Sequence, residues 1–315
     1  MSQTPSLTTP MTVAAVGVHV LDTHVVGIES IPERSDGQLV EAIRMSPAGT
    51  AGGTAVVLSR LGAQVRSYGA IGTDPVGDTL LALLGREGVE VGGLVRKDSA
   101  QTSASVLPVR PDGDRPAWHC IGANGAFSLD DLPDDLLDGL THLHLGGPEF
   151  LGGEAAGRLL ARARAAGVTT SVDVLAPGDA DMLAWIADAL PHTDFLLPND
   201  EQVLGFTGAV SLAEGAQALL GHGVGCVAVT QGAKGALVAD GSGVVEVPAY
   251  AVDVVDTTGC GDAFSAGFLR GLSLGHAPAD AARLGCATAA QVAQGLGTDA
   301  GSYDLATVQE LARLR

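Results

Sequence analysis

The stretch Val254-Val-Asp-Thr-Thr-Gly-Cys-Gly-Asp-Ala-Phe-Ser-Ala-Gly-Phe-Leu-Arg-Gly-Leu272 decides the fold of this chain. β-Branched residues predict a strand over residues 251–255, which a glycine-containing turn ends. Apolar side chains at positions 264, 268 and 272 predict one buried face of a helix that begins at Asp262. The small residues between them would let this helix lie close against a sheet. The stretch therefore predicts a strand, a turn and a helix that pack together.

The turn of this stretch suits an anion. Gly259 and Gly261 can adopt positive φ and let the backbone approach a ligand closely. The start of a helix leaves N–H groups without partners and carries a partial positive charge, which favours a phosphate. Asp262 would stand beside that phosphate as a base. Taken alone, Asp262 could equally be a helix N-cap, and the glycines ordinary turn residues.

The whole string is more specific than its parts. Residues 256–264, Asp-Thr-Thr-Gly-Cys-Gly-Asp-Ala-Phe, resemble the C-terminal signature of the ribokinase-like (PfkB) family of sugar and nucleoside kinases. The resemblance implies that Asp262 is the catalytic base and that Gly259, Cys260 and Gly261 form the anion hole. It extends over roughly residues 12–298. The fold it implies is an α/β, ribokinase-like, mostly parallel wound sheet flanked by helices, with a small β lid.

Composition limits the partners of the protein. The chain of 315 residues has 36 acidic and 17 basic side chains, a net charge of −19, so we expect no nucleic-acid or anionic-membrane partner. Hydrophobic residues make up 46% but aromatic residues only 3%, which predicts a core of Ala, Val and Leu. Four scattered cysteines without a C-x-x-C pair, no signal-peptide pattern and no membrane-length apolar run favour the cytoplasm.

We expect one kinase domain over residues 12–315, preceded by a flexible tail over residues 1–11. Strands and helices alternate along most of the chain, which favours a mostly parallel sheet covered on both faces. Two β-rich insertions, at about residues 23–47 and 99–124, interrupt this alternation and would form the lid. The second contains a hairpin around the turn at residues 111–114.

The nucleotide site is predicted from two further segments. Thr230-Gln-Gly-Ala-Lys-Gly235 could be a plain hairpin, but it resembles the Thr-x-Gly-x-x-Gly segment of the family. The resemblance implies that Thr230, Gly232 and Gly235 lie along the nucleotide phosphates, together with Thr258 of the signature. Lys234 would add only a supporting charge.

Asn199 and Gln202 form the other segment, Pro198-Asn-Asp-Glu-Gln202. By itself it is typical of a capped helix start. The family has Asn-x-x-Glu here, whose Glu helps to hold Mg²⁺, so the resemblance places Asn199 near the nucleotide and Gln202 near the metal. Because Gln carries no negative charge, we expect Mg²⁺ to depend more on ATP itself.

The acceptor half departs further from the family. Asp22 matches the Asp that binds sugar hydroxyls, and residues 48–62 resemble the glycine-rich substrate loop and helix. Gly49 belongs to this loop, while Gly53 stands where the family has Asn, so the ribose or fructose specificity of other members does not transfer. Asp173 ends a predicted strand where the family often reads Asp-x-Asn-x-Arg; the missing Arg argues against a sugar phosphate.

The resemblance also implies a monovalent cation such as K⁺ near Asp256, the Thr258 carbonyl and the turn at residues 295–301, although ordinary turn chemistry explains these residues equally well. The predicted function is transfer of the γ-phosphoryl group of ATP, with Mg²⁺, to a hydroxyl of a sugar or sugar-like acceptor. The alternatives are a nucleoside kinase on the same fold and a catalytically weakened sugar- or nucleotide-binding regulatory protein. A homodimer through the lid is expected from the resemblance.

Overall fold

The structure is a computed structural model that describes residues 10–28, 30, 32–34, 36–110 and 116–314. The predicted tail lies outside these residues except for Pro10 and Met11, and the predicted turn at residues 111–114 lies outside them entirely. Met11 is buried in the core and so belongs to the folded body.

A nine-stranded sheet forms the centre of the body, in the order β13-β12-β11-β10-β9-β8-β1-β4-β5. All neighbouring strands from β5 to β11 run parallel, and only β12 and β13 are antiparallel additions at one edge. The carboxyl ends of the parallel strands therefore meet along one edge of the sheet, where ligands bind in such folds. The strands are β1 (Thr12–Gly17), β4 (Gln64–Gly72), β5 (Glu90–Lys97), β8 (His142–Gly146), β9 (Thr169–Asp173), β10 (Phe195–Leu196), β11 (Cys226–Thr230), β12 (Ala236–Asp240) and β13 (Gly243–Val247).

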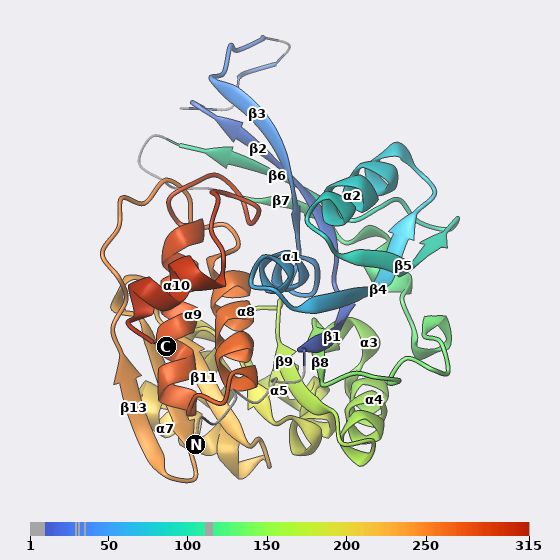
Figure 1. Cartoon of the computed structure of the whole chain (residues 1–315). Helices are drawn as coiled ribbons and strands as arrows, with labels where there is room; N and C mark the ends of the chain where they lie inside the picture. The colour runs from blue at the N-terminus through green and yellow to red at the C-terminus, as the bar shows by residue number, and fades with distance from the viewer. Residues whose placement is uncertain (1–9, 29, 31, 35, 111–115, 315) are drawn as a thin grey trace, which may run out of the picture.

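Helices cover both faces of this sheet, and the strands alternate their apolar residues between the two resulting cores (Figure 1). Val13 and Ala15 of β1 belong to one core, and Ala14 and Val16 to the other. The first core is covered by α1 (Gly52–Arg60), α2 (Pro75–Arg86), α8 (Cys260–Ser273), α9 (Pro278–Val292) and α10 (Leu305–Ala312). The second is covered by α4 (Gly153–Ala165), α5 (Ala180–Trp185), α6 (Asp200–Thr207) and α7 (Leu212–Gly221), with the short α3 (Pro148–Leu151) before α4.

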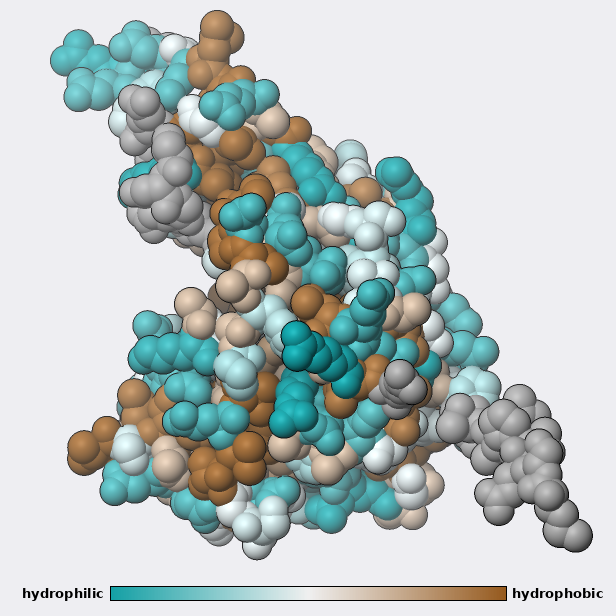
Figure 2. All heavy atoms as spheres, turned by 60° about the vertical axis from the view of Figure 1, so that its left-hand side comes forward, coloured by the Kyte–Doolittle hydropathy of each residue, from teal (hydrophilic) through white to brown (hydrophobic). Residues whose placement is uncertain are grey.

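A second, four-stranded sheet projects from the body above α1 and α8 (Figure 1). It has the order β3-β2-β6-β7, and the predicted hairpin is present as the antiparallel pair β6–β7. The first predicted insertion is more regular than expected, because β2 and β3 pair over seven residues each. Figure 2 shows this small sheet standing over a hollow, with hydrophobic residues along it. Its strands are β2 (Val20–Val26), β3 (Ala42–Ala48), β6 (Ala104–Val109) and β7 (Trp118–Cys120).

The predicted strand at residues 251–255 is wrong. This segment forms no ladder with the sheet, and its end bonds instead to the end of α9, with Val255 N donating to Ala293 O at 2.8 Å. Val254 and Val255 remain exposed by 61% and 52%, so their β-branched side chains reflect no buried strand. The following helix, α8, begins at Cys260, two residues before the predicted start.

The apolar face predicted for α8 is confirmed, since Phe264 and Phe268 are buried and stack at a centroid distance of 6.0 Å. Gly267, however, serves a different contact from the one expected. A Cβ there would lie 2.4 Å from Thr288 Oγ1 of α9, so this glycine lets α8 lie close against a neighbouring helix rather than against the sheet.

Candidate active site

The first turn of α8 offers free backbone donors. Gly259 precedes the helix with φ +76°, and a Cβ there would lie 2.2 Å from Thr298 Oγ1, so only glycine fits this position. The N–H groups of Gly261 and Asp262 donate to no protein acceptor within the described residues. Gly261 faces open space. Unpaired amides at a helix N-terminus are a geometry that can bind an anion.

Asp262 is not an N-cap. The cap position of α8 is Gly259, and no side chain caps this helix. The half-buried Asp262 carboxylate lies directly over Gly53 at the start of α1, where a Cβ would come within 2.1 Å of Asp262 Oδ2. Glycine at the position where the family has Asn thus leaves the space that the carboxylate occupies.

The protonation of Asp262 is set by its surroundings. Burial raises the pKa of Asp262 well above its ordinary value, and the nearby carboxylates of Asp173 and Asp22 raise it further. This outweighs the helix N-terminus, which would by itself favour the ionised form. A carboxylate with a raised pKa is a stronger base, and one closer to neutral pH is better matched to general-base catalysis.

Asp22 and Asp173 approach Asp262 from two different elements. Asp22 is a buried residue of β2 in the small sheet, and Asp173 ends β9 at the carboxyl edge of the main sheet. Burial raises the pKa of Asp173 to about 8, although Ser265 Oγ of α8 donates to Asp173 Oδ2 at 3.2 Å. The carboxylate of Glu149 adds to this rise.

In the sequence, Asp173 stands out only because the Arg that follows it in the family is missing, and no motif marks Glu149. Glu149 accepts the amides of Leu175 and Ala176 at 2.9 and 2.8 Å, which holds its carboxylate against the loop after β9. The available signal was position, because both acids directly follow or end neighbouring parallel strands. The proximity of Asp173 to Asp262, and of Glu149 to Asp173, depends on tertiary structure.

Three of the five predicted nucleotide residues line one pocket of about 590 Å³, whereas Asn199 and Thr258 do not. Thr230, Gly232 and Gly235 form one wall, and Cys260 and Gly261 at the start of α8 form another. The remaining lining is mostly apolar and without a charged side chain. It comes from the segment before α8, from α8 itself and from α9 with its C-cap: Ala249, Tyr250, Ala251, Val252, Val254, Thr257, Phe264, Cys286, Ala289, Ala290 and Ala293. An apolar pocket that opens onto free helix amides suits an aromatic base attached to phosphates. Lys234 is exposed and does not line it.

Asn199 and Gln202 lie beside this pocket rather than in its wall. Asn199 forms an isolated β-bridge with Thr230. Asn199 and Gln202 form a capping box, in which the side-chain oxygen of each residue accepts the backbone N–H of the other. The Gln202 amide nitrogen also donates to Val174 O at 2.7 Å and to Ala176 O at 3.0 Å. The structure thus gives Gln202 a structural role that a carboxylate could not perform, because Glu lacks those donors.

Asp256 and Thr258 form the buried core of the loop before α8. Asp256 Oδ1 accepts from Thr258 N and Oγ1 at 3.0 and 2.8 Å, and Oδ2 accepts from Gly297 N at 3.0 Å. His24 Nδ1 of the small sheet lies 3.6 Å from Asp256 Oδ2. These contacts show why Thr258 does not line the nucleotide pocket. They also tie the loop to the turn at residues 295–301 and to β2.

No group of three or more His, Cys, Asp or Glu side chains is placed to hold a metal ion in the described ranges. No single described helix is long and apolar enough to span a membrane, although the bent pair α6–α7 meets the same criteria.

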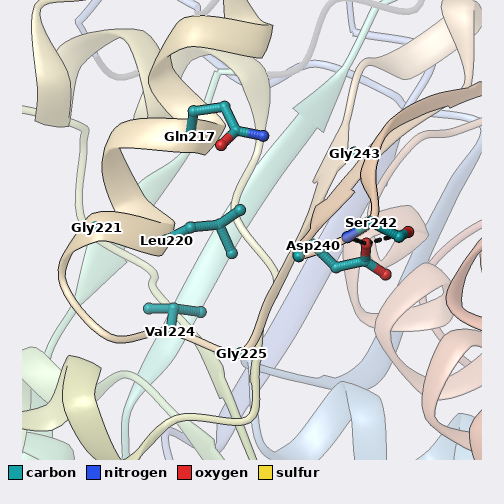
Figure 3. A pocket seen from close by; sticks show the side chains of 9 residues that line it. Gln217, Leu220, Gly221, Val224, Gly225, Asp240, Ser242 and Gly243 are labelled. Atoms are coloured by element: carbon teal, nitrogen blue, oxygen red, sulfur yellow. Dashed lines mark hydrogen bonds between the residues drawn. The ribbon is translucent and has the colours of Figure 1, made fainter.

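A second cavity, of about 630 Å³, lies far from the predicted residues, between α7 and the β12–β13 turn (Figure 3). Asp240 in its wall pairs with Cys226 at the amino end of β11, opposite the end that carries Thr230.

The chain is similar to known proteins in both sequence and fold. The model of the pfkB family carbohydrate kinases matches residues 16–304. A cytidine kinase from Thermococcus kodakarensis is 31% identical over 283 residues, which cover 87% of this chain and 96% of that protein. A fructokinase from Vibrio alginolyticus is 27% identical over 254 residues, which cover 78% and 81%. The crystal structure of a putative ribokinase II from E. coli in complex with ATP and Mg²⁺ superposes with a TM-score of 0.80 at 21% identity, over 96% of this chain and 99% of that one.

Proposed function

The chain belongs to the pfkB family of carbohydrate kinases, and we propose that Asp262 and the first turn of α8 transfer the γ-phosphoryl group of ATP to a hydroxyl of a sugar or sugar-like acceptor. One observation carries this assignment of residues. The nucleotide pocket and the cluster of Asp22, Asp173 and Asp262 meet at α8. Gly261 lines the pocket, and the next residue, Asp262, lies over Gly53 of the predicted substrate loop.

The nucleotide would lie between two walls of the pocket. Its base fits the apolar part that includes Tyr250, and its phosphates follow Gly232 and Gly235 toward the free amides of Gly261 and Asp262. Backbone donors fixed before the reaction stabilise the charge on the moving phosphoryl group without reorganisation. Phosphoryl transfer depends mainly on such positioning and electrostatics.

Asp262 would accept the proton of the attacking hydroxyl. Its carboxylate makes no hydrogen bond to the described residues, so it is free to meet an acceptor placed between Gly53 and the small sheet. Its raised pKa makes the carboxylate more basic than an exposed aspartate. The acceptor would be held on its other side by Asp22 and Asp173.

Magnesium would be held chiefly by the nucleotide phosphates, where it neutralises charge, because the capping box occupies Asn199 and Gln202. For the monovalent cation, the Asp256 carboxylate already accepts three hydrogen bonds, so backbone carbonyls of the surrounding turns would have to supply most ligands. We retain K⁺ as a proposal for this loop.

The acceptor is proposed to be neutral. The acidic groups that act on Asp262 are Asp22 and Asp173; because burial raises the pKa of Asp173 to about 8, the charge that would repel a phosphorylated sugar near pH 7 comes chiefly from Asp22. Carboxylates accept hydrogen bonds from several hydroxyls, as a free sugar or the ribose of a nucleoside offers. A regulatory protein with weakened catalysis is not favoured, since the chain matches the carbohydrate-kinase family model and kinase relatives over most of its length.

The small sheet is proposed to act as a lid and as a dimer contact. Its inner face carries the buried Asp22, His24 and Ser46, whereas its outer face exposes large apolar side chains. Met45 and Val106 both pair with Thr23, and Val106 pairs with Trp118, so Met45, Val106 and Trp118 share one face. An exposed apolar sheet face indicates an interaction surface, and a second copy of the chain is the proposed partner.

An acceptor panel tests the function. ADP formation is measured with ATP and Mg²⁺ plus D-fructose, D-ribose, cytidine or ribose 1-phosphate, with a no-acceptor control. We expect at least one neutral acceptor to raise ADP formation clearly above the control, ribose 1-phosphate to fail, and mass spectrometry to find one phosphoryl group on the acceptor. ATP binding without turnover of any acceptor would instead support a binding protein.

A further inference from the structure

Two histidines and a serine form a buried chain of hydrogen bonds on the face of the sheet that α1 and α8 cover. His142 Nε2 of β8 lies 2.8 Å from Ser171 Oγ of β9, and the same Oγ lies 2.8 Å from His144 Nδ1. His144 Nε2 in turn lies 3.1 Å from the carbonyl oxygen of Thr50. The side chains of His142, His144 and Ser171 are all buried.

The donor and the acceptor of each hydrogen bond in this network can be assigned. Burial lowers the pKa of His142 to about 3 and that of His144 to about 4, so both imidazoles are neutral near pH 7 and each carries one N–H. The Thr50 carbonyl can only accept, so His144 Nε2 carries the hydrogen and Nδ1 must accept from the Ser171 hydroxyl. Ser171 Oγ can then accept from His142 Nε2. Ser171 is the central member, because its hydroxyl makes two of the three hydrogen bonds and holds the ring of His144, whose Nε2 makes the third.

The chain of hydrogen bonds ends at Thr50, in the glycine-rich segment of residues 48–53 that is called the acceptor loop here. Besides the bond at Thr50, the amides of Ala51 and Gly52 both donate to Val18 O at 3.1 Å. Three successive residues of the loop are therefore held on the carboxyl edge of the sheet. Of the three hydrogen bonds that hold Thr50, Ala51 and Gly52, the one from His144 comes from a side chain, and the other two come from the backbone.

The position of this loop determines the space at the base. Gly53 ends the loop directly beneath Asp262, and an added methyl group there would lie 2.1 Å from Oδ2. A small shift of the loop toward or away from α8 would narrow or widen the space between Gly53 and the Asp262 carboxylate, where an acceptor hydroxyl must lie. Geometry near the reacting atoms is felt strongly in catalysis.

We propose that Ser171, acting through His144, is a positioning residue that fixes the distance between the acceptor loop and the Asp262 carboxylate. The role in acceptor binding rests on the proposed function, whereas the hold on the loop does not. Neither Ser171 nor His144 touches the nucleotide pocket. Their loss should therefore affect the acceptor side and leave the nucleotide side unchanged.

Ser171→Ala tests the hold on the loop, and Thr170→Val is its matched control. Thr170 is a buried neighbour on the opposite face of β9, and its hydroxyl bonds to His192 O at 2.7 Å and to Asp194 Oδ2 at 3.0 Å. Both variants lose one buried hydroxyl: that of Ser171 has two partners, and that of Thr170 has three, because it also accepts from Asp194 N at 3.0 Å. Thr170→Val should therefore melt at or below the temperature of Ser171→Ala. In the free protein, amide hydrogen exchange over residues 48–58 should be about tenfold faster in Ser171→Ala than in Thr170→Val, equivalent to about 1.4 kcal/mol of local stability.

Kinetics supply the second readout. For whichever of D-fructose, D-ribose and cytidine the parent uses best, Ser171→Ala should lower kcat/KM for the acceptor about tenfold while the ATP KM stays within about twofold. Ser171→Cys, which retains a weak donor, should give an intermediate exchange rate and an intermediate kcat/KM for the acceptor. Equal loop exchange in Ser171→Ala and Thr170→Val overturns the proposal, as does an unchanged kcat/KM for the acceptor. If the parent turns over none of these acceptors, the proposed function fails, while the exchange comparison still decides the positioning role.

Discussion

Gly53 leaves the space that the Asp262 carboxylate occupies. Gly53→Ala would place a Cβ 2.1 Å from Oδ2, so the base or α1 must shift. Because a displacement of about 1 Å near the reacting atoms can cost about 10²-fold, we expect turnover to fall by about that factor. Gly85→Ala in α2 is the control, since a Cβ there meets nothing within 4 Å. Parent-like turnover in Gly53→Ala would show that Asp262 does not act from this position.

Gln202 shows where residue-level reasoning reached its limit. A comparison with the family pattern predicts that Gln202→Glu strengthens the magnesium site. The structure instead shows the Gln202 amide nitrogen donating to two carbonyls, a feature that no local sequence signal reveals. The carboxylates around Asp262 were hidden for the same reason, because Asp22 and Asp173 are 151 residues apart in the chain and meet only through packing.

Gln202→Glu should therefore destabilise the protein. The buried carbonyl of Val174 and the partly buried carbonyl of Ala176 lose their donor and face a carboxylate, at a cost of about 2 kcal/mol in the free energy of unfolding. Thermal unfolding and a magnesium titration of the rate are measured on the same preparation. A variant that melts like the parent and needs less magnesium would restore the metal role predicted from the sequence.

At the scale of elements, helix α8 was predictable because a strong local pattern coincides with its tertiary role. The apolar spacing of Phe264 and Phe268 gave the buried face, and the glycines gave the free amides. The strand predicted at residues 251–255 failed because β-branched residues indicate extended backbone but not a partner. The segment bonds to the end of α9 and lines the nucleotide pocket instead.

The small sheet should respond to the acceptor. Asp22 lies on its inner face beside Asp262, and Arg44 of β3 donates to Asp299 at 2.8 Å, which links the sheet to the body. We expect hydrogen exchange over residues 103–121 to slow when the acceptor that the parent phosphorylates is added, since closing lids sequester their substrates. Peptides from α4 should not change. Identical exchange of residues 103–121 with and without that acceptor would argue against a lid.

At the scale of the whole molecule, the outer face of the small sheet is exposed and apolar. Met45 and Trp118 are 49% and 53% exposed, and charged residues are disfavoured in the core of an interface. Light scattering should find the parent as a dimer and the double variant Met45→Lys/Trp118→Lys as a monomer. Val210→Lys, at an equally apolar position that is 95% exposed outside this sheet, should remain a dimer. A monomeric parent would remove the proposed contact.

The central claim is that Asp262 is the base of an ATP-dependent kinase, and Asp262→Asn tests it most directly. The side chain makes no capping bond, and its charge is opposed by burial and by neighbouring carboxylates, so the variant should melt at or above the parent temperature. ATP affinity should stay the same or rise slightly as a negative charge is removed.

Turnover of the variant is then compared with the parent from acid to alkaline pH. The rate of the parent should fall as the pH drops through the raised pKa of Asp262, where the base becomes protonated. Asp262→Asn should turn over about 10²–10⁴-fold more slowly, without that pH step. A variant that melts normally, binds ATP and phosphorylates the acceptor at nearly the parent rate would contradict the account.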